Sequence, residues 1–160
     1  MINDHNNATR GREQLRAWED NKPTNFFAAD HNLQAVLRMY LGDDTYTAAQ
    51  ANWHQLGGQM ATVIDEAAKV EDRLANHPRL QRYNGIGERV EQIEFHPNHD
   101  LTGALIWGAG LMAVQAQPGR TVEQMGLYYL LGHNGEAGHM CSLACTSGLI
   151  RALQSAADAP

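Results

Sequence analysis

The sequence predicts an all-α protein, a helical bundle with one short β-hairpin. Three observations predict this class. Apolar residues recur every three or four positions over most of the 160 residues, which is the spacing of one face of an α-helix. The pair Asn84-Gly85 is a hairpin-turn signal, and Pro78 and Pro118-Gly119 separate the helical stretches. A hydrophobic fraction of 43% and a charged fraction of 19% are typical of a folded domain with its own core.

The first helix is expected between Asp30 and Gly42. Residues 1–24 are polar, and we expect this N-terminal segment to be frayed or extended. Asp30 is a suitable N-cap because its carboxylate can accept a hydrogen bond from a backbone N–H of the first turn. Gly42 is a suitable stop for the helix. The apolar positions of this helix are Leu33, Val36, Leu37, Tyr40 and Leu41.

A longer helix is expected over residues 47–76, because apolar residues there fall on one stripe. Gly57-Gly58 interrupts the stripe and predicts a bend or a close contact. The acidic pair Asp65-Glu66 is interpreted as part of a solvated helix face. The stripe consists of Trp53, Leu56, Met60, Val63, Ile64, Ala67, Val70 and Leu74.

The rest of the chain predicts a hairpin and three more helical stretches. The alternating segment Val90 to Phe95 follows the Asn-Gly turn and is expected to be a strand. A helix is expected over residues 100–117 and another from Thr121, and a final helix is expected over residues 136–156.

Composition excludes several classes of function. A formal net charge of −6 argues against nucleic acid as a partner, because binding it requires a surplus of Lys and Arg. The longest apolar run, residues 101–114, is shorter than the roughly 20 residues that span a bilayer, so no membrane association is expected. The N-terminus lacks the apolar stretch of a signal peptide. Two cysteines four residues apart favour a reducing compartment, and we expect a cytoplasmic location.

The stretch GHNGEAGHMCSLAC raises the question of a metal site, because it contains His133, Glu136, His139, Cys141 and Cys145. On a continuous helix the two histidines would lie about 240° apart and could not hold one ion. The two cysteines share a helix face, but a zinc site would need two further ligands. We therefore assign no metal ligand. A loop over residues 132–138 is the alternative that could still allow a metal site here.

Small residues in the same region form a seam along one helix face: Ala137, Cys141, Cys145 and Gly148. Small side chains allow a helix to approach another backbone or a flat ligand closely. Two interpretations follow. The seam is either a tight helix–helix contact or part of the wall of an apolar pocket.

Two stretches together resemble a known family. EFHPNHDLTGALIWGAGL, followed by GLYYLLGHNGEAGHMCSLACTSGLIRAL, is similar to the N-terminal helical domain of acyl-CoA dehydrogenases, and most similar to the alkylation-response, AidB-like branch. The upstream NFFAADHNLQAVLRMYL resembles the opening helix of that branch. The resemblance implies such a domain over residues 25–157. The matching positions are Phe95-His96-Pro97, Glu136-Ala137-Gly138, Cys141 and Thr146.

The resemblance also implies which parts of the enzyme this chain lacks. Complete acyl-CoA dehydrogenases add a middle β-barrel and a C-terminal helical bundle, which hold most of the FAD and supply the catalytic glutamate. We expect both parts to be absent here and assign no catalytic residue. In the family, the last helix of the N-terminal domain forms one wall of the acyl pocket. By position, Cys141, Cys145, Thr146 and Leu149 are expected to bind substrate, and Thr146 also the flavin edge.

Some features leave alternatives open. The Thr146 hydroxyl could instead bond back to a carbonyl of its own helix. Ser142 stands where the branch often has proline, and Cys145 where a larger residue is common, so the shape of the pocket is not fixed by the resemblance.

The resemblance implies an N-terminal domain or small subunit of an FAD-dependent acyl-CoA dehydrogenase-like oxidoreductase. The expected partners are a chain or segment carrying the β-barrel and C-terminal bundle, further copies in an oligomer, and an acyl thioester. FAD is expected only with those missing parts. The alternative is a stand-alone helical binding or scaffolding module without activity.

Overall fold

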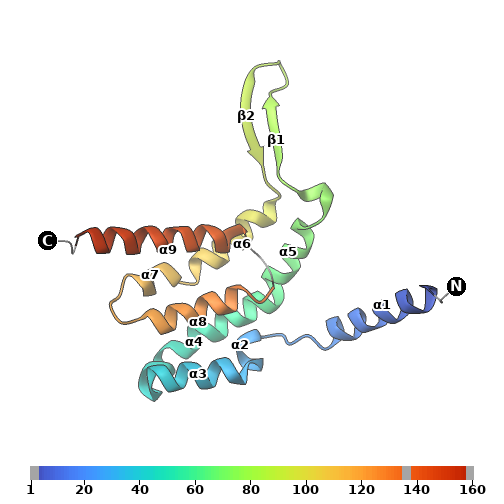
Figure 1. The fold of residues 1–160 in the computed structure, drawn as a ribbon. Helices are drawn as coiled ribbons and strands as arrows, with labels where there is room; N and C mark the ends of the chain where they lie inside the picture. The colour runs from blue at the N-terminus through green and yellow to red at the C-terminus, as the bar shows by residue number, and fades with distance from the viewer. Residues whose placement is uncertain (1–3, 135–137, 158–160) are drawn as a thin grey trace.

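The computed structural model describes residues 4–134 and 138–157, and its arrangement is a helical bundle from which two segments project (Figure 1). Helices α3 (His31–Leu41), α4 (Asp43–Gln59) and α8 (Thr121–Leu131) pack against one another on one side of the bundle. The predicted class is confirmed, since the described residues are mostly helical with one two-stranded antiparallel hairpin.

The other side of the bundle contains α6 (Pro97–Gly108), α7 (Leu111–Gln115) and α9 (Gly138–Ala157). Helix α9 packs on α6 and α7, and α7 also contacts α8 (Figure 1). The short helix α2 (Phe26–Ala29) packs on α4. None of the helices in the described ranges is long and apolar enough to cross a membrane.

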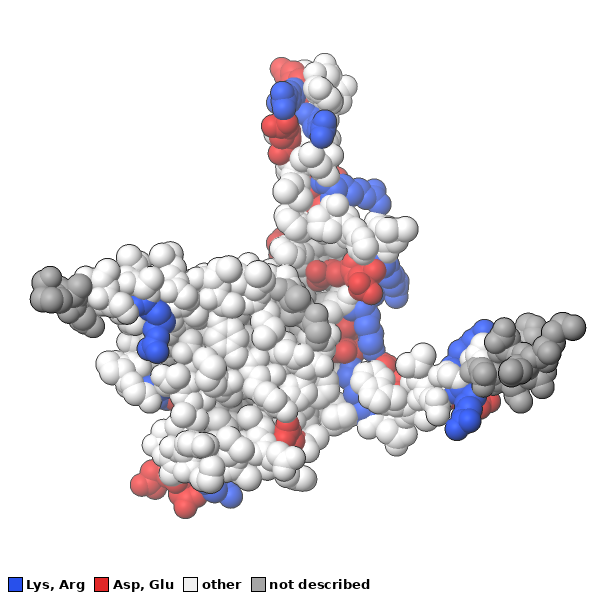
Figure 2. Space-filling model, viewed as in Figure 1, with Lys and Arg blue, Asp and Glu red and all other residues white. Residues whose placement is uncertain are grey.

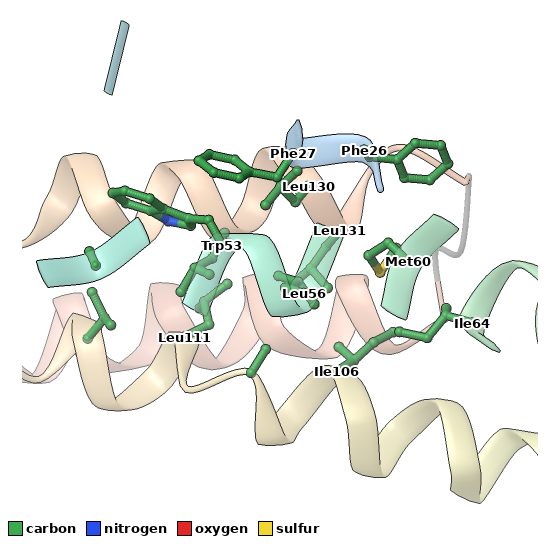
Figure 3. Packing of buried hydrophobic residues seen from close by; sticks show 14 of the residues in the cluster. Phe26, Phe27, Trp53, Leu56, Met60, Ile64, Ile106, Leu111, Leu130 and Leu131 are labelled. Atoms are coloured by element: carbon green, nitrogen blue, oxygen red, sulfur yellow. The ribbon is translucent and has the colours of Figure 1, made fainter. Parts of the chain in front are cut away.

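The centre of the core comes from the predicted stripe of the long helix. Trp53, Leu56, Met60 and Ile64 are at most 1% exposed and face the surrounding helices (Figure 3). Burial of such apolar surface is the main favourable term in folding. The neighbouring helices contribute fully buried partners to this cluster: Ile106, Leu111, Leu127, Leu130, Leu131 and Leu143.

The predicted long helix is built from three segments. After α4 the chain forms a π-helical segment, Met60–Ile64, and then α5 (Asp65–Glu71). A π-helical turn holds more residues than an α-turn, so it rotates the apolar stripe relative to the core. This explains why Val63, expected on the stripe, is half exposed. The expected end near residue 76 was also wrong, because Leu74 lies in a separate 3₁₀ turn.

The close contact predicted at Gly57-Gly58 is confirmed. A Cβ atom on Gly57 would lie 2.6 Å from the backbone nitrogen of Phe27, so only glycine allows α2 to approach α4 this closely. Asn25 fixes α2 in place, because its Oδ1 caps the helix at the Ala28 N–H and its Nδ2 donates to the His54 carbonyl at 2.8 Å.

The caps of α3 also match the prediction. Asp30 Oδ1 accepts a hydrogen bond of 2.8 Å from the Leu33 N–H, and Gly42 ends the helix with φ of 75°. The helix predicted over 100–117 is divided into α6 and α7 at Gly110, whose φ of 79° lies in the left-handed region. That glycine lies inside an apolar run, so periodicity alone did not reveal the break.

The hairpin consists of β1 (Arg79–Tyr83) and β2 (Arg89–Glu94), with Leu80 opposite Ile93. Asn84 organises the turn, because its Oδ1 accepts from the backbone N–H groups of Ile86 and Glu88. Figure 1 shows the hairpin extending away from the bundle, and both of its strands are exposed along their length.

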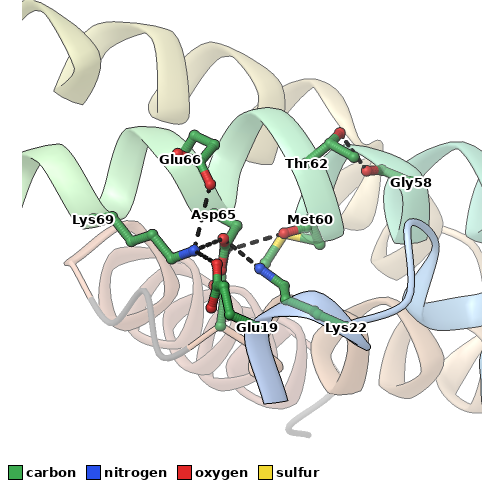
Figure 4. A network of polar contacts seen from close by, with 9 residues as sticks. Glu19, Lys22, Gly58, Met60, Thr62, Asp65, Glu66 and Lys69 are labelled. Carbon is green, nitrogen blue, oxygen red and sulfur yellow. Dashed lines mark hydrogen bonds and ion pairs between the residues drawn. The ribbon is translucent and has the colours of Figure 1, made fainter. Parts of the chain in front are cut away.

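Residues 1–24 contradict the expectation of a frayed or extended segment, because α1 occupies Asp4–Asp20. This helix projects from the bundle and is tied to it near its C-terminal end (Figures 1 and 4). Lys22, in the following connection, forms an ion pair with Asp65, and Glu19 forms one with Lys69. A mostly polar helix gives no apolar periodicity, which is why the sequence pattern did not predict it.

Candidate functional site

Helix α9 carries the residues predicted to bind substrate, and it has two different faces. Its inner face packs on α6 and α7 through buried Leu143 and half-buried Met140 and Ile150. Its outer face is exposed from end to end. Figure 2 shows that the bundle carries few charged side chains on this side, in contrast to the hairpin and α1.

A polar network fixes the position of α9 on the bundle. The Ser147 hydroxyl donates to Gln115 Oε1 at 2.6 Å and accepts from the Tyr128 hydroxyl at 2.8 Å. Gln115 Nε2 donates to the Ser147 carbonyl at 2.9 Å, and Gln124 Nε2 donates to Gln115 Oε1 at 2.8 Å. The network joins α7, α8 and α9 in a partly buried position, so it determines which face of α9 points outward.

Sequence reasoning missed this network. The bonded pairs are 9 to 32 positions apart in the sequence, so no local spacing links them. The only signal in the sequence is a set of polar residues at positions that helical spacing would place on packed faces.

We expect Ser147→Ala to lower the free energy of unfolding by about 1–3 kcal/mol, because it leaves partly buried amide and hydroxyl groups without their partner. Ser142→Ala is the matched control. The Ser142 hydroxyl is exposed and bonds only to the Gly138 carbonyl of its own helix, so its loss should change stability by less than about 0.5 kcal/mol. Urea unfolding followed by circular dichroism measures both. Equal effects of the two variants would contradict the anchoring role.

The structure brings three of the four predicted substrate-binding residues onto the outer face. Cys141, Cys145 and Leu149 follow one another at four-residue spacing, and all three are exposed. A Cβ atom on Gly148 would meet no atom within 4 Å. The interpretation of this seam as a tight contact within the chain is therefore wrong for its described residues. Ala137, the first member of the seam, lies outside the described residues.

Thr146 lies at the border of the outer face and is half-buried. Its hydroxyl donates to the Ser142 carbonyl at 2.9 Å, which is the back-bond considered as an alternative. The hydroxyl proton is therefore already used, and the oxygen can still accept a hydrogen bond from a group outside the chain.

The two histidines of the stretch GHNGEAGHMCSLAC, His133 and His139, lie in different surroundings. The ring of His133 stacks on Phe26 at 4.9 Å between centroids, whereas that of His139 stacks on His99 at 4.3 Å. A Cβ atom on Gly103 would lie 2.7 Å from the His139 ring, so α6 and α9 touch closely there. Glu136 lies outside the described residues. The alternative of one ion held by both histidines has no support in this geometry.

A different cluster was not predicted at all. Glu19, Asp65 and Glu66 bring carboxylate oxygens within 4.8 Å of one another, and in the described residues they pair with Lys22 and Lys69 (Figure 4). Asp65 is buried, so its interpretation as part of a solvated face was wrong. Burial alone would raise the pKa of Asp65, but hydrogen bonds and charges from the two lysines outweigh it and lower the pKa.

Comparison with known proteins identifies one family for this chain. The chain matches the family model of the adaptive response protein AidB N-terminal domain over residues 17–160. Searches of curated proteins and of solved structures found no match. Because the family model covers nearly the whole chain, the resemblance predicted from the sequence is confirmed, and this chain belongs to the acyl-CoA dehydrogenase-like AidB N-terminal domain family.

Proposed function

We propose that the chain forms one wall of the acyl and flavin site of an acyl-CoA dehydrogenase-like protein, with the outer face of α9 as that wall. One observation carries this proposal. The inner face of α9 is fixed by the Ser147 network, while the small and apolar side chains on its outer face are exposed, and a Cβ atom on Gly148 would meet no atom within 4 Å. Acyl chains require apolar, closely fitting walls, and small side chains leave space for them.

The residues of α9 could contact only one edge of a flavin. Cys141, Cys145 and Gly148 offer a shallow apolar surface, and the Thr146 oxygen offers one hydrogen-bond acceptor beside it. Nothing on this face would bind the phosphates of FAD, for which Lys or Arg side chains or backbone N–H groups are the usual partners. FAD, when bound, supplies the redox chemistry. The role of this chain is to exclude water from one side of the substrate.

The proton chemistry of such a reaction would also come from elsewhere. Helix α9, over residues 138–157, contains no Asp or Glu, and its one histidine, His139, is half-buried against α6 with Nε2 3.0 Å from the His99 carbonyl. A base that removes a proton beside an acyl thioester would therefore lie on another element. We therefore assign substrate binding to Cys141, Cys145, Thr146 and Leu149, the flavin edge to Thr146, and catalysis to none of them. The β-barrel and C-terminal bundle of the same or a partner polypeptide would complete the site.

Thiol accessibility tests this proposal, because Cys141 and Cys145 are the only cysteines of the chain and both lie on the proposed wall. We expect both to react with Ellman's reagent in the isolated chain. When the chain is combined with a β-barrel and C-terminal bundle polypeptide of this family and FAD, we expect a flavin-bearing complex in which both react at least about tenfold more slowly.

Single-cysteine variants, Cys141→Ser and Cys145→Ser, assign the protection to each position, and Leu149→Asp should weaken the complex by placing a charge on the apolar wall. A flavin-bearing complex with both thiols still fully reactive would show that another face of the bundle meets the flavin-bearing part. A colourless chain that forms no complex would favour the stand-alone binding module.

A further inference from the structure

A cavity of about 850 Å³ lies between the end of α1, its connection to α2, the start of α3 and the residues that follow α8. This volume is within the range of ligand pockets, about 300–1,000 Å³. No described residue of α9 lines it, so it is separate from the wall proposed above. The apolar residues of its lining are Trp18, Pro23, Phe26 and Ala29, and the other lining residues are polar or charged.

Asp30 and Asp65 are the acidic residues of the lining, and Asp65 is paired with Lys22 and Lys69. The side chain of Asp30 is only 18% exposed. Its Oδ1 caps α3, and its Oδ2 accepts a hydrogen bond of 2.9 Å from the Tyr129 hydroxyl. This bond, with burial and the charge of Asp30, raises the pKa of Tyr129. Within the described ranges no lysine or arginine pairs with Asp30. His133 Nε2 lies 4.0 Å from Asp30 Oδ2 and is a cationic partner only when its ring is protonated. Beside a neutral imidazole, a shielded carboxylate without a lysine or arginine partner favours the binding of a cation.

His133 places a second acceptor beside Asp30. Its Nδ1 lies 3.1 Å from the Tyr129 carbonyl, an acceptor, so Nδ1 carries the proton of the neutral ring and Nε2 carries the lone pair. Nε2 lies 4.0 Å from Asp30 Oδ2. Stacking on Phe26 and an edge contact with Tyr129 hold the ring in this orientation.

Two acceptors separated by this distance leave space for one nitrogen that donates to both, since each N–H···O or N–H···N bond measures about 2.8–3.0 Å. An ammonium nitrogen has several N–H groups in a tetrahedral arrangement, and it also interacts favourably with aromatic faces. A carboxylate or phosphate would instead face the charge of Asp30 and the lone pair of His133.

The lysines of this cavity do not reverse that preference. Lys22 and Lys69 both line it, but Asp65, Glu19 and Glu66 pair with them. Among the described residues, the four carboxylates of Asp30, Asp65, Glu19 and Glu66 at or beside the cavity outnumber the two ammonium groups of Lys22 and Lys69, which gives these six groups a formal charge of −2. The Lys22 nitrogen already lies about 6 Å from the rings of both Trp18 and Phe26, so these rings tolerate an ammonium group nearby.

We propose that this cavity binds an organic ammonium ion with an apolar body. The ammonium group donates to Asp30 Oδ2 and His133 Nε2, and the apolar body lies against Trp18, Pro23 and Phe26. Figure 3 shows the Phe26 ring at the margin of the buried cluster, pointing away from Phe27, where one of its edges can meet a ligand. This proposal is independent of the proposed acyl and flavin wall on α9.

Isothermal titration calorimetry of the full chain with three matched probes tests the proposal: phenylpropylamine, phenylpropanol and phenylpropionate. We expect the amine to bind at least about tenfold more tightly than the alcohol and the carboxylate. Asp30→Asn should weaken binding of the amine about tenfold or more, because a charge-assisted hydrogen bond is lost. Asparagine is as good an N-cap as aspartate, so this variant keeps α3 intact.

Asp44→Asn is the control, since it removes the same charge from an exposed position on α4 outside the cavity. His133→Phe is a second variant, which keeps a ring beside Phe26 and removes the second acceptor, and it should also weaken binding of the amine. Equal affinity for the alcohol would reduce the site to an apolar cleft, and tighter binding of the carboxylate would assign it to the lysines. Either of these two results would overturn the proposal. Equal effects of Asp30→Asn and Asp44→Asn, or no binding of the amine, would also overturn it.

Discussion

Trp53→Ala is expected to lower the free energy of unfolding by about 3–5 kcal/mol. Trp53 has no exposed surface, and its ring packs between Phe27 at 5.8 Å and Tyr46 at 5.7 Å. A Cβ atom on Gly126 would lie 3.2 Å from Trp53 Nε1, so α8 lies directly on the indole. Alanine would leave a large cavity where α2, α4 and α8 meet, because a close-packed interior relaxes only partly around a lost side chain.

Urea unfolding followed by circular dichroism measures this effect, with Trp53→Phe as the matched control. The indole Nε1 is buried and has no hydrogen-bond partner among the described residues, so phenylalanine removes an unsatisfied donor while keeping an aromatic ring there. We expect this smaller change to cost less than about 1.5 kcal/mol. Similar losses for alanine and phenylalanine would show that the volume of the ring does not hold these helices together.

The sequence predicted the elements whose signals are local. Asp30 and Gly42 mark the ends of α3 because a cap and a left-handed stop depend only on adjacent residues. The turn at Asn84 is equally local, since its side chain bonds to residues within the same turn. The break at Gly110 was missed because apolar residues continue on both sides of it, and apolar spacing alone does not determine backbone φ.

In the candidate site, too, the features set by local spacing were predicted, and those set by contacts between distant residues were missed. Helical spacing correctly placed Cys141, Cys145 and Gly148 on one helix face, whereas Leu149 was assigned to the site only from the family resemblance. Spacing did not show that this face is the outer one, because that orientation depends on Ser147 bonding to residues of α7 and α8. Ion pairs across 43 and 50 positions, from Lys22 to Asp65 and from Glu19 to Lys69, likewise leave no periodic signal.

Those ion pairs give the attachment of α1 a defined pH window. The folded pKa of Asp65 is lowered below its ordinary value of 3.8, so its contribution to stability is complete above that value and is lost as the pH falls through the lower folded pKa. The contribution of Lys69 to stability depends on pH in the opposite direction. Hydrogen bonds from Lys69 to Asp65 and Glu19 raise its pKa above 10.5, so its contribution is complete below 10.5 and is lost at higher pH.

Asp65→Asn is therefore expected to lower the free energy of unfolding at neutral pH by about 3 kcal/mol, because it leaves the ammonium of Lys22, whose side chain is only 9% exposed, without its carboxylate. The difference between this variant and the wild type should begin to shrink as the pH falls below 3.8, and it should disappear as the pH falls through the lowered folded pKa, where folded wild-type Asp65 also takes up a proton. Urea unfolding at several pH values measures this. Limited proteolysis reports whether α1 is released first, since α1 meets the bundle near this network.

The double variant Asp65→Asn with Lys22→Met separates a true pairing from simple loss of packing. If the unpaired ammonium causes the loss, methionine keeps the apolar stem of the lysine, removes its charge and restores most of the stability. The double variant should then unfold at a higher urea concentration than Asp65→Asn alone, and the stability difference between the two should not depend on pH between about 5 and 9. Additive losses in the double variant would mean that Lys22 and Asp65 contribute separately, and that α1 is attached by its apolar contacts instead of by charge.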